Sequence, residues 1–412
     1  MTAQEVTLLL YNLTLIPMTF FSLLFVLLSI LHLCVPPVKR RHKKLKELPF
    51  VTVQIPSFND PIAARCVAHC LDFNYPKDKY EIMIVDDSTN AETQALLAGL
   101  AAEHEHVRYI HRTNREGYKP GALKAAMRHV KGELIVLFDA DWMPKKNFLQ
   151  KVVRPFADPK VAIVQTRQGF YNKNTNIITR FAAYTLMIYH TIIMPLHNRA
   201  NSVFFCGTAG AIRKKAMDAV GGWDPRSITE DAELTVRLLR AGYKTTYLDY
   251  TTPSEVPDTF EGFIKQQMRW CYGNARVFLD NAGEVLFKKG LTLQQRLLIL
   301  YVTLGNIIAP VVVLMTIFGF SGWFIGDPTL MQLQDVITLL GRFALTIGFL
   351  LIGSLTLYKQ NMLGDIKYLL LGAFTVGLVL SVANTFALYK AFRNTKLGWF
   401  CTPKTDNTQL VA

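Results

Sequence analysis

Three long stretches of the chain contain no Asp, Glu, Lys or Arg, and they lie toward its two ends. They are Val6 to Val38, Leu297 to Gly326 and Tyr368 to Tyr389. A charge-free apolar run of about 20 residues can cross the hydrocarbon core of a membrane as a helix. The pattern predicts an N-terminal anchor over residues 1–38 and a C-terminal membrane region over residues 291–412. The candidate spans of the second region are Leu297–Phe320, Val336–Leu357 (interrupted by Arg342) and Tyr368–Tyr389.

Between these regions, residues 39–290 alternate between short apolar, β-branched runs and amphipathic stretches. This alternation predicts an α/β domain in which helices cover both faces of a mostly parallel sheet. The expected strands are Phe50–Ile55, Glu81–Val85, Val107–His111, Glu133–Phe138 and Val161–Thr166. Ile62–Asp72 and Pro120–Val130 are expected helices, the latter with Pro in its first turn.

Two further stretches, Ile177–Leu196 and Phe260–Leu279, are rich in aromatic and aliphatic residues but also carry polar ones. We interpret both as too polar to span a membrane and too apolar for an ordinary surface helix. They are therefore predicted to lie at the membrane interface. The alternative, in which they pack on the sheet, stays open.

Charge and composition agree with a mixed chain of a soluble domain and membrane helices. Half of the 412 residues are hydrophobic, mean hydropathy is positive, and the formal net charge is +14. A basic cluster directly follows the first apolar run, and it consists of Lys39, Arg40, Arg41, Lys43, Lys44 and Lys46. The positive-inside rule then places the central domain in the cytoplasm and the N-terminus outside. Anionic headgroups attract the same cluster, so the charge favours a lipid bilayer and not a nucleic acid as partner.

The first apolar run is predicted to be an uncleaved anchor, because no basic segment precedes it and a basic one follows it. The six cysteines are scattered along the chain. Cys66 and Cys70 have no His or Cys partners at ligand spacing, so two small core residues are expected there and not a zinc site.

Acidic residues follow two of the expected strands, at the edge where α/β sheets bind ligands. Asp86 and Asp87 end one strand, and Asp139-Ala140-Asp141 ends another. Carboxylates are suited to hold Mg²⁺ or Mn²⁺, which usually share their ligands with substrate phosphates. A D-x-D tripeptide alone is a weak signal, but its place after an apolar strand favours metal or nucleotide binding over a solvated turn. For Asp86-Asp87, the alternative is a capping pair at a helix start.

Two motifs later in the chain carry further groups that are suited to catalysis or binding. Thr229-Glu230-Asp231 precedes an amphipathic stretch, and it fits either a helix cap or a general base. The residues alone do not decide between these. In Gln266-Gln-Met-Arg-Trp270, the Arg fork can bind diphosphate oxygens and the Trp face can stack on a sugar. The alternative is a membrane-interface Trp beside a snorkelling Arg.

Taken in order, D,D, DxD, TED and QxxRW resemble the family 2 glycosyltransferases of the cellulose synthase superfamily, over about Val51 to Phe278. QxxRW is the specific element, because it marks the processive branch. Further stretches resemble the mannan and glucan synthase-like members, and they are Asp86–Asn90, Arg115–Lys124, Cys206–Gly210 and Gly221–Trp223. Trp142, an aromatic residue after the DxD, favours the mannan synthase-like subgroup.

The resemblance implies a GT-A fold, an inverting mechanism and a role for each matching residue. Asp231 would be the base, with Glu230 beside it, and Asp139 and Asp141 would hold Mg²⁺ or Mn²⁺. The implied nucleotide-sugar-binding residues are Asp86, Asp87, Lys119, Asp139, Gln266 and Arg269. The implied acceptor-binding residues are Cys206, Gly207 and Trp270. Trp399–Lys404 resembles a gating loop, with Thr402 and Lys404 at its polar positions.

The expected activity is transfer of a sugar from UDP-glucose or GDP-mannose to the non-reducing end of a growing β-linked glycan. Transfer of one sugar to a membrane lipid, and a non-catalytic sensor of nucleotide-sugars, are the alternatives. An export partner or a second copy of the chain stays open, as does the membrane (a bacterial inner membrane or the Golgi). Three spans after a cytoplasmic domain would leave the gating-like tail outside. We therefore expect Tyr368 to Arg393 to lie partly in the interface.

Overall fold

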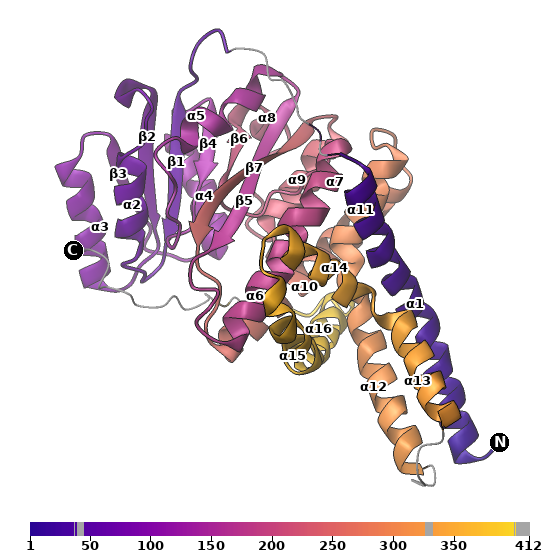
Figure 1. The fold of residues 1–412 in the computed structure, drawn as a ribbon. Coiled ribbons are helices and arrows are strands. Elements are labelled where there is room, and N and C mark those ends of the chain that lie inside the picture. Colours follow the sequence, from indigo (N-terminus) through magenta and orange to yellow (C-terminus); the bar gives the residue numbers. More distant parts are fainter. Residues whose placement is uncertain (37, 39–44, 326–332, 399, 401–412) are drawn as a thin grey trace.

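The computed structural model describes residues 1–36, 38, 45–325, 333–398 and 400. Within them, a seven-stranded sheet has the order β3-β2-β1-β4-β6-β5-β7 (Figure 1). The strands are β1 (Val51–Ser57), β2 (Tyr80–Asp86), β3 (Val107–His111), β4 (Leu134–Leu137), β5 (Val161–Phe170), β6 (Gly210–Arg213) and β7 (Lys244–Ser254). Only β6, in this part of the chain, runs antiparallel to its neighbours. The predicted α/β class with a mostly parallel sheet is confirmed.

The five predicted strands correspond to β1–β5, and the sequence interpretation missed β6 and β7. β6 has four residues, too few for a clear periodic signal, and it begins at the last residue of the Cys206–Gly210 motif. β7 is rich in Thr and Tyr and carries Lys244 and Asp249, so it lacks the apolar run that marked the other strands. β7 pairs only with β5 in the described sheet and forms its edge, where polar side chains reach solvent.

Six helices flank the sheet in the described chain, and their hydrophobic sides form its core. They are α2 (Ala63–Leu71), α3 (Ala91–Glu103), α4 (Tyr118–Ala126), α5 (Phe148–Val152), α8 (Lys214–Ala219) and α9 (Glu230–Arg240). Cys66 and Cys70 on α2 are fully buried, as expected of small core residues. α4 begins two residues before Pro120, where Gly117 has a φ of 69° and turns the chain into the helix.

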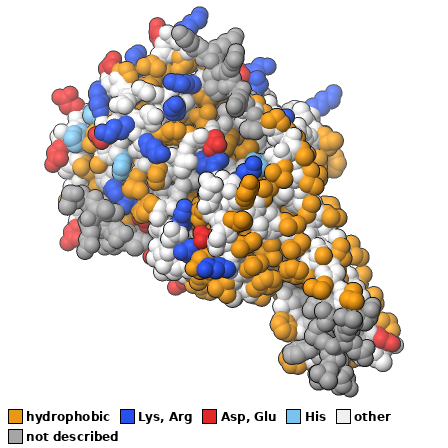
Figure 2. All heavy atoms as spheres, in the orientation of Figure 1, with side chains coloured by type: hydrophobic (Ala, Val, Ile, Leu, Met, Phe, Trp, Pro, Cys, Tyr) orange, Lys and Arg blue, Asp and Glu red, His pale blue; other side chains and the backbone are white. Residues whose placement is uncertain are grey.

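The remaining helices form the apolar part of the molecule. They are α1 (Ala3–Cys34), α6 (Ile177–Ile188), α7 (Met194–Arg199), α10 (Phe260–Leu286), α11 (Leu293–Leu304), α12 (Ile308–Ile325), α13 (Leu333–Thr346), α14 (Gly348–Lys359), α15 (Ile366–Phe374) and α16 (Val376–Phe392). α1, α12 and α13 pack together and extend away from the sheet (Figure 1). α14, α15 and α16 lie beside α6 and α10, between this bundle and the sheet. Hydrophobic side chains cover the bundle and its surroundings, and charged ones gather over the sheet domain (Figure 2).

Three helices are long and apolar enough to cross a membrane, and two bent helix pairs bring the number to five at most, within the described residues. Two of the predicted candidate spans are bent in the structure. Val336–Leu357 is broken between α13 and α14, which meet at 60°, and Tyr368–Tyr389 is broken between α15 and α16, which meet at 43°. At the first break, the amide of Gly348 donates to Ser22 Oγ (2.8 Å), and a Cβ at Gly348 would collide with the backbone of Ser22.

Ile177–Leu196 was also interpreted as too polar to span a membrane, and its hydropathy shows that this is wrong. The continuous helix Ile177–Arg199, made of α6, a π-helical turn and α7, passes the same length and hydropathy test. About 61% of its most apolar window is nevertheless buried, because α6 packs against β5, α14 and α15. The open alternative, packing on the sheet, holds for part of this helix, because α6 contacts β5 and α7 contacts β7, while α14 and α15 cover the rest of α6.

Candidate active site

A cavity of about 230 Å³ opens at the carboxyl ends of the strands. Among the predicted site residues that the structure describes, only Asp86 does not line it. The others meet there from the segments after β2 and β4, from the segment before β6, and from α4, α9 and α10. They are Asp87, Lys119, Asp139, Asp141, Cys206, Gly207, Glu230, Asp231, Gln266, Arg269 and Trp270. Thr402 and Lys404 lie outside the described residues.

Asp86 differs from the prediction that it contacts a nucleotide. Its carboxylate is fully buried and accepts hydrogen bonds from the Ser88 hydroxyl (2.6 Å) and the Tyr109 hydroxyl (2.9 Å). His111 Nδ1 lies 3.0 Å from the same carboxylate. Successive side chains of a strand point to opposite faces. Asp86 therefore fixes the end of β2 against β3, and Asp87 is the member of the pair that faces the cavity.

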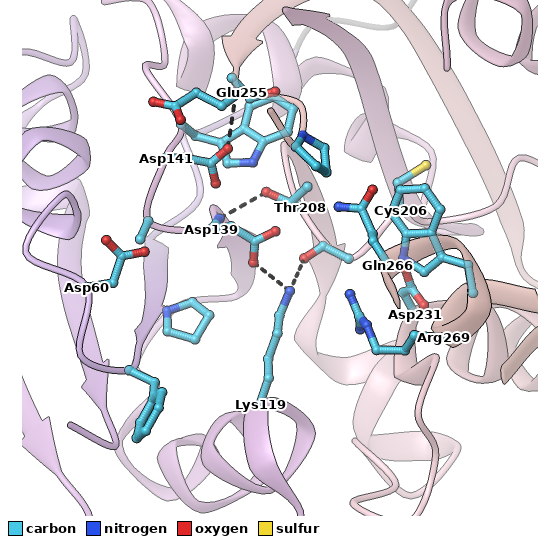
Figure 3. Close-up of a pocket in the computed structure, with 18 of the residues that line it drawn as sticks. Asp60, Lys119, Asp139, Asp141, Cys206, Thr208, Asp231, Glu255, Gln266 and Arg269 are labelled. Carbon is cyan, nitrogen blue, oxygen red and sulfur yellow. Dashed lines mark hydrogen bonds and ion pairs between the residues drawn. The ribbon is translucent and has the colours of Figure 1, made fainter. Parts of the chain in front are cut away.

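Lys119 links three segments at the centre of the cavity (Figure 3). Its Nζ lies 2.6 Å from Asp139 Oδ1, 3.0 Å from the carbonyl oxygen of Gly207 and 3.8 Å from Glu230. Burial acts to lower the pKa of Lys119, but the carboxylates of Asp139 and Glu230 outweigh it, so the pKa lies above its usual value. The ammonium group therefore stays charged where a diphosphate would need a cation.

Glu230 and Asp231 begin α9 and face the same cavity. Burial raises the pKa of Glu230 to about 7 and also raises the pKa of Asp231, while the ammonium of Lys119 acts in the opposite direction on both. Gly207 makes room for this pair: its φ is 72°, and a Cβ there would lie 3.0 Å from Asp231 Oδ2. A carboxylate whose pKa is raised toward neutrality is suited to accept a proton.

Cys206 also lines the cavity, but its thiol is not a reactive one. Burial raises the pKa of Cys206 well above its usual value, and Asp231 adds to the effect. A protonated thiol is a weak nucleophile. Cys206 therefore contributes shape to the wall beside Asp231.

Asp139 and Asp141 form the part of the cavity that fits a divalent cation. The amide of Asp139 donates to Thr208 Oγ1 (3.0 Å), and Asp141 Oδ2 accepts from the amide of Glu255 (3.1 Å), which hold the turn after β4 (Figure 3). The described residues contain no cluster of three or more His, Cys, Asp or Glu that would complete a metal site. Two carboxylates fit Mg²⁺ or Mn²⁺ when phosphate oxygens and water complete the shell.

Arg65 and Glu255 support Asp141 from behind, and no sequence motif marked them. Arg65 Nη2 lies 3.1 Å from Glu255 Oε1 and 3.0 Å from the hydroxyl of Tyr171, which also donates to Glu255. The same nitrogen reaches the carbonyl oxygen of Asp141 (3.4 Å), and both charged side chains are buried. The pair therefore joins α2 to the end of β7 and fixes the backbone around Asp141.

We expect Arg65→Leu to lower the melting temperature by about 10 °C. Breaking a buried ion pair costs about 3–5 kcal/mol, and each kcal/mol corresponds to a few degrees in a domain of this size. The matched control is Lys146→Leu, which removes the exposed pair between Lys146 and Asp72 (3.2 Å) and should shift the melting temperature by about 2 °C or less. Thermal unfolding of both variants in detergent tests this, and equal shifts would contradict it.

Gln266, Arg269 and Trp270 reach the cavity from α10. α10 lies close to the start of α9 because its position 273 is a glycine: a Cβ there would collide with the side chain of Thr229. This contact sets the distance between Asp231 on one helix and Arg269 on the other.

Gly273→Ala is expected to lower kcat by about 10- to 100-fold, because a shift of about 1 Å between catalytic groups has effects of this size. Thr229→Ala in the same chain removes the two atoms that would collide and should restore part of the loss. Gly283→Ala, also on α10 but with no atom near its Cβ, is the control and should turn over like the wild type. Loss of activity in the control variant would mean that α10 tolerates no alanine at all.

Phe400 and Trp142 complete the cavity wall, and the predictions had not assigned either of them a place there. Trp142, noted above only as an aromatic residue after the DxD, is buried and lines the cavity. Phe400 lines it too, and Lys265 Nζ on α10 lies 4.5 Å from the centre of its ring. Phe400 belongs to the predicted gating-like segment Trp399–Lys404, so the one described residue of that segment lies at the cavity.

Known proteins resemble this chain in sequence and in fold. The sequence model of the family described as Glycosyltransferase like family 2 matches residues 49–273. The protein described as "Probable glucomannan 4-beta-mannosyltransferase 7" from Oryza sativa subsp. japonica is 35% identical over 281 residues, which are 65% of this chain and 48% of that protein. Glucomannan 4-beta-mannosyltransferase 9 from Arabidopsis thaliana is 34% identical over 265 residues, 61% of this chain and 50% of that protein. The chain spans about half the length of these curated relatives.

A solved structure has the same fold along nearly the whole chain. It is the mannosyltransferase PcManGT from Pyrobaculum calidifontis in complex with GDP-Man and Mn²⁺, with a TM-score of 0.64 and 16% identity. The superposition covers 96% of this chain and 100% of that one. The similarity confirms the predicted GT-A type of fold.

Proposed function

The chain belongs to the glycosyltransferase-like family 2, and from that premise we propose that it transfers a hexosyl group from a nucleoside diphosphate sugar to a β-linked glycan. The observation that carries the proposal is one cavity in which Lys119, Asp139, Asp141, Asp231 and Arg269 face one another. GDP-mannose is the favoured donor, because the relatives named above are described as mannosyltransferases. The favoured product is a growing polysaccharide, extended at its non-reducing end.

In the proposed reaction, Asp231 accepts the proton of the acceptor hydroxyl while the hydroxyl oxygen attacks the anomeric carbon of the donor. The bond between that carbon and the diphosphate oxygen breaks, the nucleoside diphosphate leaves, and the configuration inverts. Lys119 and Arg269 carry positive charge toward the leaving diphosphate, and Arg269 can hold it with two parallel hydrogen bonds. Trp270 offers a flat apolar face to the acceptor sugar. Asp87 is proposed to bind the nucleoside.

Asp139 and Asp141 are the proposed ligands of the divalent cation, with Mn²⁺ or Mg²⁺ as the ion. When bound, this ion supplies a Lewis acid that neutralises charge on the diphosphate. Lys119 would exchange part of its contact with Asp139 for the diphosphate. Without that exchange, Asp139 would remain paired with the ammonium group of Lys119 and would be less able to bind the cation.

A donor screen with the purified protein tests the proposal. UDP-glucose, UDP-N-acetylglucosamine and GDP-mannose, each radiolabelled, are supplied with Mn²⁺, with Mg²⁺ and with a chelator. Product from GDP-mannose that needs the cation and elongates with time, as size separation shows, supports a polysaccharide. Label that moves into organic solvent would instead identify a glycolipid, and donor binding without turnover would identify a non-catalytic sensor.

The acid limb of the pH profile gives a second test. A base works only when deprotonated, and burial raises the pKa of Asp231, so the acid limb of kcat/KM should lie at higher pH than an ordinary aspartate would give. Lys119 lowers the pKa of both Glu230 and Asp231, so Lys119→Met should move this limb to higher pH. Lys124→Met, an exposed lysine on the same helix, is the control. A limb that stays in place in Lys119→Met would contradict the assignment of Asp231.

A further inference from the structure

Arg112 does not line the cavity, but it is joined to a residue that does. It directly follows β3, three residues before the stretch that begins at Arg115. Its Nε lies 2.7 Å from Asp87 Oδ1, and its Nη2 lies 2.5 Å from Asp87 Oδ2. Two parallel contacts of this kind fix the orientation of a carboxylate as well as its position. Only 13% of the Arg112 side chain and 5% of the Asp87 side chain are exposed, so water competes little for the pair.

The same guanidinium group also holds the start of α4. Arg112 Nη1 donates to the carbonyl oxygen of Glu116 (3.2 Å), and Nη2 donates to the carbonyl oxygen of Tyr118 (3.2 Å). The turn between these carbonyls is strained, because Gly117 (φ 69°) and Tyr118 (φ 50°) both have a left-handed backbone. A residue with a side chain as large as that of Tyr118 rarely adopts this conformation unless its surroundings hold it there. Arg112 therefore stabilises the turn whose next residue is Lys119.

The two segments that Arg112 joins carry two different parts of the proposed donor site. Asp87 is the residue proposed for the nucleoside, and Lys119 extends from α4 to the centre of the cavity, where the diphosphate is proposed to bind (Figure 3). A nucleoside diphosphate is one ligand, so both contacts form together only when the two protein groups are held in the right geometry. Arg112 is the side chain that connects them.

The pairing with Arg112 leaves Asp87 able to bind a ligand. A guanidinium group has donors only, and the two oxygens of a carboxylate offer about four acceptor positions. Arg112 takes one position on each oxygen of Asp87. The remaining positions can accept from donors of a ligand in the cavity, such as the hydroxyl groups of a ribose.

We propose that Arg112 is a positioning residue for the donor, which fixes Asp87 relative to Lys119 so that one rigid arrangement meets the nucleoside and the diphosphate together. This role rests on the proposed function, in which these two residues bind a nucleoside diphosphate sugar. Arg112 acts through Asp87. Removal of both residues should therefore weaken donor binding no more than removal of Asp87 alone.

A matched arginine at the other end of the same two strands provides the control. Arg108 lies on β3, and its Nη1 is 3.4 Å from Glu81 Oε2 on β2. It also donates to a backbone carbonyl, that of His129 (2.9 Å). Glu81 is the second residue of β2, whereas Asp87 follows the carboxyl end of that strand, where the cavity opens. Arg108→Met therefore removes a comparable link between β2 and β3 without touching the donor site.

Calorimetric titrations with GDP, UDP and inorganic pyrophosphate, each with Mn²⁺, test the proposal. The nucleotide that binds the wild type more tightly serves as the nucleotide probe, and pyrophosphate reports the diphosphate contacts without a nucleoside. The variants are Arg112→Met, Arg112→Lys, Asp87→Ala, the double variant Asp87→Ala with Arg112→Met, and Arg108→Met. Arg112→Lys is included because it keeps the charge, so it reports the positioning even where Arg112→Met reduces stability.

In Arg112→Met, the dissociation constant of the nucleotide should rise by about 10- to 100-fold, because a shift of about 1 Å in a positioned group has effects of this size. The dissociation constant of pyrophosphate should stay within about threefold of the wild-type value, because Lys119 keeps its contacts with Asp139 and the carbonyl oxygen of Gly207. The KM of the donor should rise in the same way as the nucleotide constant, with a much smaller change in kcat.

The other variants separate positioning from a general effect on the fold. Arg112→Lys should bind the nucleotide with intermediate affinity, because an ammonium group cannot make two parallel contacts and hold two carbonyls at once. Arg108→Met should change neither dissociation constant by more than about threefold. The double variant should bind the nucleotide as Asp87→Ala does, because residues that act through one another are not additive.

Three results would overturn the role of Arg112. They are wild-type affinity for the nucleotide in both Arg112 variants, a loss of pyrophosphate binding as large as the loss of nucleotide binding, and losses that multiply in the double variant. Failure of the proposed function itself would look different. A wild-type protein that bound neither GDP nor UDP would overturn that function, and the role of Arg112 with it.

Discussion

Asp231→Asn is expected to lower kcat by about 10³-fold and to leave the dissociation constant of the donor within about threefold of its wild-type value. General base catalysis contributes about 10²- to 10⁴-fold, and the amide cannot accept the acceptor's proton. The donor should still bind, because the proposed contacts to diphosphate come from Lys119 and Arg269. Turnover of radiolabelled donor and calorimetric titration with the unreactive nucleoside diphosphate measure the two quantities separately.

Glu233→Gln is the matched control for this prediction. Glu233 also lies in the first turn of α9, but it pairs with Arg237 on the side of the helix away from the cavity. The variant removes an acid from the same helix end, so it reports any general effect on the helix dipole. Equal turnover in Asp231→Asn and wild type would show that Asp231 is not the base. A large loss in Glu233→Gln would show that the effect belongs to the helix and not to the cavity.

Glu230 needs a separate comparison because it lies beside Asp231 and shares Lys119. Burial holds the pKa of Glu230 near 7, so at neutral pH it divides its time between the two protonation states. Asp231 is the favoured base because Gly207 leaves its carboxylate room to face the cavity. Glu230→Gln should therefore reduce kcat less than Asp231→Asn does. It should also move the acid limb of the pH profile to lower pH, because the loss of one negative charge next to Asp231 lowers the pKa of Asp231.

The sheet could be predicted where burial is complete and local. β2 and β4 are mostly apolar on both faces, and a nearly continuous apolar run of that kind carries its own signal. β1 places Val51, Val53 and Ile55 on one face, and this β-branched apolar pattern also marks a strand. β7 lies at the edge of the sheet and contains many polar residues, so its own sequence is a weak strand signal. Pairing with β5 is what makes it a strand. β6 is a strand because it pairs with β4 and β5, and its own four residues are too few to predict it.

The bends of the membrane helices could not be predicted for a related reason. Neither Ile347-Gly348 nor Thr375 contains proline, and each lies inside an apolar stretch that reads as one helix. The break at Gly348 depends on Ser22, more than 300 residues earlier in the sequence, whose hydroxyl accepts from the Gly348 amide. Contacts of this kind exist only after α1 and α14 have met.

The candidate site shows the same division. Motif residues such as Asp139, Asp231 and Arg269 were found because their chemistry is visible in short stretches of sequence. Asp86 was assigned with its neighbour Asp87, although successive residues of a strand face opposite ways. Arg65 and Glu255 act through each other across 190 positions of sequence, and neither lies in a motif.

Asp141→Asn is expected to lower kcat/KM by about 10³-fold and to remove most of the stimulation by Mn²⁺. A Lewis acid on the diphosphate contributes several kcal/mol, and each 1.36 kcal/mol corresponds to a factor of ten. The neutral amide keeps one oxygen and can still accept from the amide of Glu255, so the turn after β4 should keep its shape. Mn²⁺ binding in the presence of the nucleoside diphosphate, followed by electron paramagnetic resonance, gives a readout that does not depend on turnover. Asp158→Asn, which weakens an exposed pair with Lys244 (2.9 Å) at the other end of the sheet, should leave both readouts unchanged.

Asp139→Asn should differ from Asp141→Asn in a way that separates the two carboxylates. Asp139 is bound to Lys119 before any donor arrives, so its loss frees the ammonium group as well as removing a proposed ligand. In Asp139→Asn, Mn²⁺ binding should therefore be weakened strongly. Donor binding measured without Mn²⁺ should be weakened less, because Lys119 becomes more available to the diphosphate. In Asp141→Asn, Lys119 keeps its partner, and metal-free donor binding should stay at the wild-type level. If both variants bound Mn²⁺ as tightly as the wild type, the cation would not lie between these two carboxylates, and the proposed metal site would be wrong.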